Sequence, residues 1–72
     1  MRLEIKVKDK HFVSYIEICL QVIGSGVYDL KDDVFTLNVN PLHAPMLNEF
    51  ISGVMKREGH NTTEIYEMST NN

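Results

Sequence analysis

The sequence has little that could fix a fold covalently or anchor it in a membrane: it contains no tryptophan, one cysteine and two prolines, and it has no long apolar run. One cysteine cannot form an internal disulfide, and no residues have the spacing of a structural zinc site. No apolar run approaches about 18 residues, the length that spans a membrane. No positively charged segment followed by an apolar one opens the chain. We therefore expect a cytoplasmic protein that does not contact a membrane and binds no metal or other cofactor.

The sequence also lacks an excess of positive charge. Its ten acidic residues outnumber its seven lysines and arginines, which gives a net charge of −3 at pH 7. Four of the basic residues lie within residues 2–10, but Glu4 and Asp9 lie among them. Proteins that bind nucleic acids neutralise several phosphates with clustered lysines and arginines. We therefore do not expect this protein to bind nucleic acid, and its acidic excess is too small for a mimic of DNA.

What the chain does have is enough apolar residues for one small core. It contains 72 residues, of which 43% are hydrophobic and 24% are charged. This composition is typical of globular proteins and too apolar for a disordered chain. A chain of this length buries only about 60% of the surface that its unfolded form exposes, so its stability is modest. We predict a single domain over residues 1–68, followed by a flexible tail over residues 69–72.

The most apolar segment, HFVSYIEICLQVIG at residues 11–24, fits two patterns. Its apolar residues recur with helical spacing, and almost as many alternate as they would in a strand. The ends of the segment favour a helix, because Ser14 and Glu17 have the S-x-x-E spacing of a capping box and Gly24 is well placed to end it. We predict a helix over residues 10–23, in which Cys19 fills part of the core.

Other residues support the same helix. Asp9 offers an earlier cap for it, and Val13 and Ile18 have the spacing of a hydrophobic staple. Together with Val22, these two apolar residues widen the apolar face of the predicted helix. We expect such a wide face where a helix lies flat on a sheet.

Three further segments predict strands. Residues 2–8 alternate strictly between polar and apolar, which predicts a half-buried strand. Residues 27–30 and 34–39 flank a turn at residues 31–33, which predicts a hairpin. Residues 62–68 predict a last edge strand.

A second helix is predicted to start at Pro45, because proline is favoured in the first turn of a helix and disrupts its interior. Gly59 is expected to end it. Gly53 lies in mid-helix, where glycine costs about 1 kcal/mol relative to alanine, so we interpret it as a point of close packing. The predicted buried stripe consists of Leu47, Phe50, Ile51 and Val54.

These elements follow one another as βαββα, or βαββαβ if the last strand forms. This order predicts an α+β class, a small ferredoxin-like sandwich in which an antiparallel sheet carries two helices on one face. In the alternative fold, residues 12–23 form a strand of a β-meander capped by one C-terminal helix. RNA-binding domains of the ferredoxin-like type display aromatic residues on the open face of their central strands. The sequence places no aromatic residue there.

No combination of residues predicts catalysis. His11, His43 and His60 are far apart in the sequence and fall at the ends of predicted elements. A reactive cysteine needs an exposed, electropositive setting, whereas we expect Cys19 in the core. The three aspartates within residues 29–33 lack the glycine and glutamate that complete a calcium loop. We therefore expect that the protein is not an enzyme.

The function that remains is binding. We predict a small non-catalytic, regulatory protein-binding module, such as an inhibitor, adaptor or accessory protein, and we treat an origin in a phage or mobile element as a hypothesis. We also expect self-association through an unpaired sheet edge. The alternative is a ferredoxin-like domain that binds a nucleic acid or a small molecule. Methionine and tyrosine adapt well to partner surfaces, and the residues predicted to contact the partner are Tyr28, Met46, Met55, Tyr66 and His43.

Overall fold

The computed structural model of the protein describes residues 1–23 and 27–71. The helix end predicted at Gly24 and the last tail residue, Asn72, lie outside the described residues. Within this part of the chain, the strands are β1 (Arg2–Val7), β2 (Asp29–Lys31), β3 (Val34–Asn38) and β4 (Tyr66–Asn71). The helices are η1 (Lys10–Phe12), α1 (Val13–Val22), α2 (Ala44–Arg57) and α3 (Thr62–Ile65).

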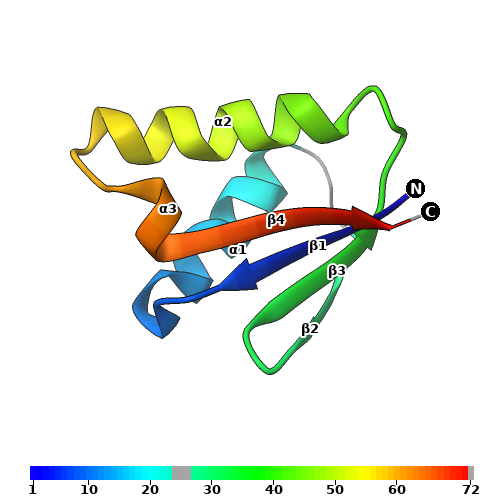
Figure 1. The fold of residues 1–72 in the computed structure, drawn as a ribbon, viewed down its shortest axis with the longest axis horizontal. Helices are drawn as coiled ribbons and strands as arrows, with labels where there is room; N and C mark the ends of the chain where they lie inside the picture. The colour runs from blue at the N-terminus through cyan, green and yellow to red at the C-terminus, as the bar shows by residue number, and fades with distance from the viewer. Residues whose placement is uncertain (24–26, 72) are drawn as a thin grey trace.

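The strands form one sheet in the order β2-β3-β1-β4, and every neighbouring pair is antiparallel. The two long helices, α1 and α2, pack against one face of this sheet (Figure 1). The structure therefore confirms the predicted α+β class, with an antiparallel sheet in a small compact fold. It excludes the β-meander, because residues 13–22 form a helix.

One face of the sheet and the inner sides of the helices form a single core. Residues that pair across antiparallel strands share a face, so Leu3 lies beside Leu37, and Ile5 lies beside Phe35. All four are at most 4% exposed, which confirms the alternation predicted for residues 2–8 and 34–39. The helices contribute Ile16, Cys19 and Leu20 from α1, and Ala44, Leu47, Ile51 and Met55 from α2.

The first helix starts differently from the prediction. The Asp9 carboxylate accepts a hydrogen bond from the His11 backbone N–H at 3.0 Å, so it caps η1 and the chain is already helical three residues before α1. Phe12 holds the cap position of α1, and its side chain makes no capping hydrogen bond. Ser14 consequently lies inside α1, and the predicted capping box and staple are wrong. The earlier cap that Asp9 offers is confirmed.

The hairpin between β2 and β3 turns at Asp32 and Asp33, whose φ angles are 52° and 62°. A two-residue hairpin turn of this type needs positive φ at both positions, and aspartate tolerates that region better than most residues. Lys31, which was predicted in the turn, instead belongs to β2 and pairs with Val34. The first arm is nevertheless shorter than predicted, because it begins at Asp29 and not at Val27.

The boundaries of α2 agree with the prediction. Pro45 lies in its first turn, and Gly59, just beyond its end, has a φ of 83°. Gly53 does not mark close packing, because a Cβ placed on it would meet nothing within 4 Å. Met55, predicted to contact a partner, is wholly buried in the core. The stripe of α2 is therefore rotated toward Met55, and Phe50 and Val54 are only half-buried.

The end of the chain also differs from the prediction. Asn61 accepts a hydrogen bond from the Thr63 backbone N–H at 3.3 Å and caps α3, so residues 62–65 are helical rather than extended. β4 begins only at Tyr66, and it continues through residues 69–71, which pair with β1. Residues 69–71, which were predicted in the tail, are therefore part of the sheet. The backbone ladder with β1 holds this polar segment in the sheet.

Candidate functional site

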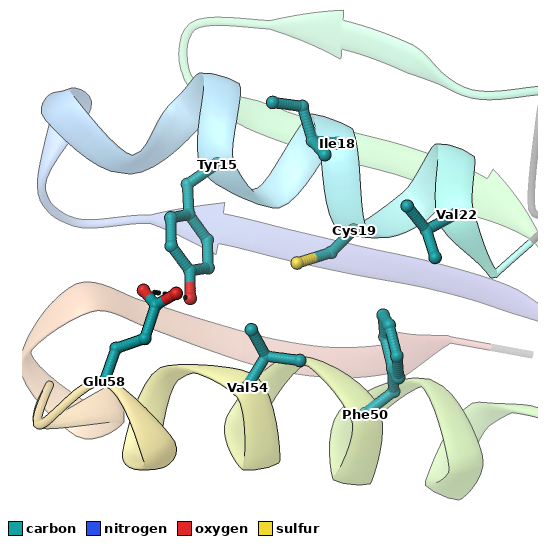
Figure 2. Close-up of a pocket in the computed structure, with 7 residues that line it drawn as sticks. All are labelled: Tyr15, Ile18, Cys19, Val22, Phe50, Val54 and Glu58. Atoms are coloured by element: carbon teal, nitrogen blue, oxygen red, sulfur yellow. Dashed lines mark hydrogen bonds between the residues drawn. The ribbon is translucent and has the colours of Figure 1, made fainter.

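A groove of about 290 Å³ lies between α1 and α2 on the outer side of the helical layer. The two helices run antiparallel, so Tyr15 near the start of α1 faces Glu58 just beyond the end of α2, and Val22 faces Phe50 (Figure 2). The groove is lined by Tyr15, Ile18, Cys19, Val22, Phe50, Val54 and Glu58. Its walls are almost entirely apolar.

The apolar walls of this groove are open to solvent. Ile18 is 59% exposed and Val22 is 70% exposed, although both lie on a helix that packs against the core. Across from them, Phe50 and Val54 are half-buried on α2. Single exposed apolar residues are ordinary, but a contiguous set of them across two elements is typical of a binding surface.

One end of the groove is closed by a polar contact. The Tyr15 hydroxyl donates a hydrogen bond to the Glu58 carboxylate at 2.8 Å. Desolvation of the phenol, and then this hydrogen bond, raise the pKa of Tyr15 to about 12. His60 and Phe12 pack behind this pair, with ring centroids 4.9 Å apart. Because Glu58 is held by Tyr15, a fixed negative charge stands at this end of the groove.

Cys19 lies at the floor of the groove, between Ile18 and the core. It is 6% exposed, and burial, followed by the charge of Glu58, raises the pKa of its thiol. The thiolate is the nucleophilic form of cysteine. The setting of Cys19 therefore suppresses reactivity, as the sequence predicted, and its role in the structure is to fill space.

His43 and His60 lie at the ends of elements, as predicted, whereas His11 is the middle residue of η1. His11 belongs to η1 and its Nδ1 lies 3.0 Å from the Asp9 carboxylate. His43 precedes α2, and His60 lies between α2 and α3, half-buried. Over the described residues, no group of three or more histidine, cysteine, aspartate or glutamate side chains could hold a metal ion.

Of the residues predicted to contact a partner, the structure brings two together. His43 and Met46 line a small pocket of about 140 Å³ with Ile23 and Leu47, at the start of α2. Met46 is 59% exposed, so its side chain is available to a partner.

The other three predicted contact residues are spread over the molecule. Met55 is in the core and cannot reach a partner from there. Tyr66 is 6% exposed, and its hydroxyl donates to the Asn48 amide oxygen at 2.9 Å. Tyr28 is half-buried, and its hydroxyl donates to the Glu17 carboxylate, which raises the pKa of the phenol. These residues do not form one surface.

The sequence did contain a signal for the groove. Seven of the ten residues of α1 are apolar or aromatic, more than one buried stripe requires. The wide face was interpreted as packing on the sheet, but Ile18 and Val22 point away from it and line the groove. The surplus of apolar residues in α1 was therefore the sign of a second, exposed surface.

The open face of the sheet is polar. Pairing places Arg2 beside Asn38, Glu4 beside Thr36, and Lys6 beside Val34 on this face. None of these side chains is aromatic, as the sequence predicted. Among the described residues, the open face of the two central strands, β1 and β3, therefore has no aromatic side chains on which bases could stack.

Comparisons give no relatives: no protein-family model, curated protein or solved structure matches the chain significantly. In the part of the chain that the structure describes, no helix has the length and hydropathy needed to cross a membrane. The candidate site therefore rests on the geometry of the groove itself.

Proposed function

We propose that the protein is a small non-catalytic binding module whose α1–α2 groove accepts the apolar side of an amphipathic helix from a partner protein. The observation that carries this proposal is the exposure of Ile18 and Val22 on one wall, opposite the half-buried Phe50 and Val54 on the other. The raised pKa of the buried Cys19 supports a non-catalytic role, because it disfavours the thiolate.

A helix suits this groove better than an extended peptide does. Both walls are helices, whose backbone N–H and C=O groups are already paired within each helix. An extended segment would find no backbone partners there, whereas a helix satisfies its own. Phe50 and Glu58 are eight positions apart on this wall, which is about 12 Å along a helix. Two turns of a partner helix, with apolar residues at i, i+4 and i+7, match this length.

Charge further defines the partner. Among the described residues that line the groove, only Glu58 carries a charged side chain. Its carboxylate is fixed by Tyr15 at one end of the groove. A lysine or arginine at one end of the partner's apolar stripe would be paired with Glu58. The partner helix is therefore expected to combine an apolar stripe with one basic end.

The two alternative functions have less support than protein binding. The open face of the sheet is polar, whereas binding of single-stranded RNA needs aromatic side chains there. The groove is at the small end of the volumes typical of small-molecule sites. The protein-binding role is favoured for a physical reason. An apolar surface that is shallow and continuous across two helices is typical of protein interfaces.

The proposal is tested by selecting displayed random 14-residue peptides on the full chain. Val22→Asp places a carboxylate in the groove, and Val27→Asp makes the same change at a valine that is 90% exposed and outside it. The selected peptides should carry an apolar stripe with helical spacing and a lysine or arginine at one end of it. Their affinity should fall about 30-fold with Val22→Asp, the effect of losing about 2 kcal/mol at an interface anchor, and should not change with Val27→Asp.

Two results would refute the proposed groove. In the first, no peptide is enriched on the full chain over the Val22→Asp variant. In the second, enriched peptides bind both variants equally well. Circular dichroism of each variant provides the control for folding, and we expect no change because both valines are exposed.

A further inference from the structure

The two edges of the sheet differ in how well they are protected against pairing with another strand. β2, at one edge, has only three residues, and a short edge strand pairs poorly. β4, at the other edge, has six residues, YEMSTN, with no proline and no lysine. Proline, lysine and shortness are the common means by which proteins block an edge. The edge of β4 has none of the three.

Backbone hydrogen bonds show which groups of the sheet point outward. The Val7 N–H donates to the Asp33 carbonyl at 2.9 Å, on the side of β3. At the other end of β1, the Val39 N–H donates to the Met1 carbonyl at 2.9 Å. Backbone groups of successive residues in a strand point to opposite sides. The odd-numbered residues of β1 therefore point toward β3, and the even-numbered ones point toward β4.

This alternation fixes the direction of the backbone groups in β4. Glu4 points toward β4 and pairs with Ser69, so the backbone of Ser69 points toward β1. The residues on alternate positions, Tyr66, Met68 and Thr70, therefore direct their backbone groups away from β1, and of these the Tyr66 N–H already donates to the Thr62 carbonyl of α3. Two grooves of about 430 and 270 Å³ run beside this edge, and Met68 lines both of them. Met68 is half-buried at this edge, and the two residues that follow it, Ser69 and Thr70, are exposed.

The outward-facing residues are spaced symmetrically about Met68. If a second β4 is placed antiparallel to the first with the two Met68 residues opposite each other, Tyr66 of each copy pairs with Thr70 of the other. The Met68 N–H and C=O groups then pair with those of the second Met68, and the Thr70 N–H donates to the Tyr66 carbonyl of the second copy. On the open face, Glu67 lies opposite the second copy's Ser69, so the like charges of the two Glu67 residues are not opposed. A second copy of the same chain therefore complements this edge in both hydrogen bonding and charge.

We propose that two copies of the protein associate through β4, antiparallel about Met68, and join their sheets into one continuous sheet of eight strands. This proposal does not depend on the groove between α1 and α2. The contact is one six-residue strand from each copy, which buries less than the roughly 1,200 Å² typical of a stable interface. The dimer is therefore weak, with a dissociation constant on the order of 10–100 µM.

Sedimentation equilibrium of the full chain tests the association. A reversible dimer in this concentration range supports the proposal. A protein that is still monomeric at about 1 mM refutes it, since at that concentration a dimer of the proposed strength dominates.

A charge exchange tests the register. Met68→Lys places two lysines opposite each other, and Met68→Glu places two glutamates there, so each variant should dimerise at least about 10-fold more weakly. A mixture of the two variants should recover association as a heterodimer. Ser69→Lys is the control, because its lysine would face the second copy's Glu67 and keep the dimer. Unchanged dimerisation of Met68→Lys, or no recovery in the mixture, refutes the register.

Disulfide crosslinking gives a second measure that does not depend on charge. In the proposed register, the Cα atoms of two Met68→Cys residues lie about 5.5 Å apart, within the range of a disulfide. Two Ser69→Cys residues lie diagonally, about 7–8 Å apart, and cannot be bridged. With diamide as oxidant, the first variant should form a covalent dimer and the second should not. Equal crosslinking of both variants, or of neither, refutes the proposal.

Discussion

Two glycines, one within α2 and one just beyond its end, should respond to the same substitution with opposite sign. Gly53 lies in mid-helix, and a Cβ on it would meet nothing within 4 Å, so Gly53→Ala adds helix propensity without a clash. It should stabilise the protein by about 1 kcal/mol. Gly59 is equally unobstructed but has a φ of 83°, where an L side chain is strained. Gly59→Ala should therefore destabilise by about 1 kcal/mol.

Urea unfolding followed by circular dichroism measures both changes in the free energy of unfolding. The two variants should differ by about 2 kcal/mol, which in a domain of this size corresponds to roughly 8–16 °C in Tm. Destabilisation by Gly53→Ala would refute the reasoning, because it would mean that a neighbour packs closely on this position. A neutral Gly59→Ala would show that the left-handed conformation is not held in solution.

Three further predictions concern the groove and its floor. Ile16→Ala should lower the free energy of unfolding by about 3 kcal/mol, because Ile16 is fully buried. Ile18→Ala should lower it by less than about 1 kcal/mol, because the Ile18 side chain is 59% exposed. Equal losses in urea unfolding would contradict this difference in burial. Ultraviolet titration should show Tyr15 ionising near its pKa of about 12, and Glu58→Gln should lower that pKa toward 10, because the hydrogen bond and the charge both favour the neutral phenol. Since folding favours the neutral form, the contribution of Tyr15 to stability is complete below pH 10 and is lost as the pH rises from 10 to 12. Cys19 should react with a thiol reagent much more slowly in the folded protein than in urea, and equal rates would mean that the thiol is exposed.

The two proposed surfaces lie on opposite flanks of α2. Phe50 and Val54 line the groove toward α1, whereas Asn48, Ser52 and Lys56 line the pocket beside β4. A partner helix in the groove and a second copy at β4 therefore would not compete for the same side chains. Under the two proposals, one dimer presents two binding grooves.

The sequence by itself determined the features that depend on a few neighbouring residues. The alternation in residues 2–8 places one face of β1 in the core in any antiparallel sheet. Pro45 and Gly59 mark the ends of α2 through backbone restrictions that hold in any protein. The aspartates at the β2–β3 turn tolerate the positive φ that a two-residue hairpin needs. These signals depend only on neighbouring residues, so they can be recognised without knowledge of the rest of the fold.

Tertiary structure decided which of several equally apolar residues are buried. Ile16 and Ile18 are chemically identical and two positions apart, yet one is fully buried and the other is 59% exposed. Helical spacing groups Ile16 with the buried Cys19 and Leu20, but only the positions of α2 and the sheet around α1 decide that Ile18 is left exposed instead of packing on the sheet. Met55 and Val54 on α2 show the same effect, because the rotation of the helix is set by the partners it packs against.

The end of the chain depends on tertiary structure for a second reason. Ser69 and Thr70 are polar and lie near the end of the chain, which predicted a tail. They are in β4 because β1 offers a row of backbone groups that pairs with them. The sequence therefore determined the class of the fold and the local boundaries of its elements. The binding groove and the open edge arise only from contacts between segments far apart in the chain, because burial and strand pairing are properties of those contacts.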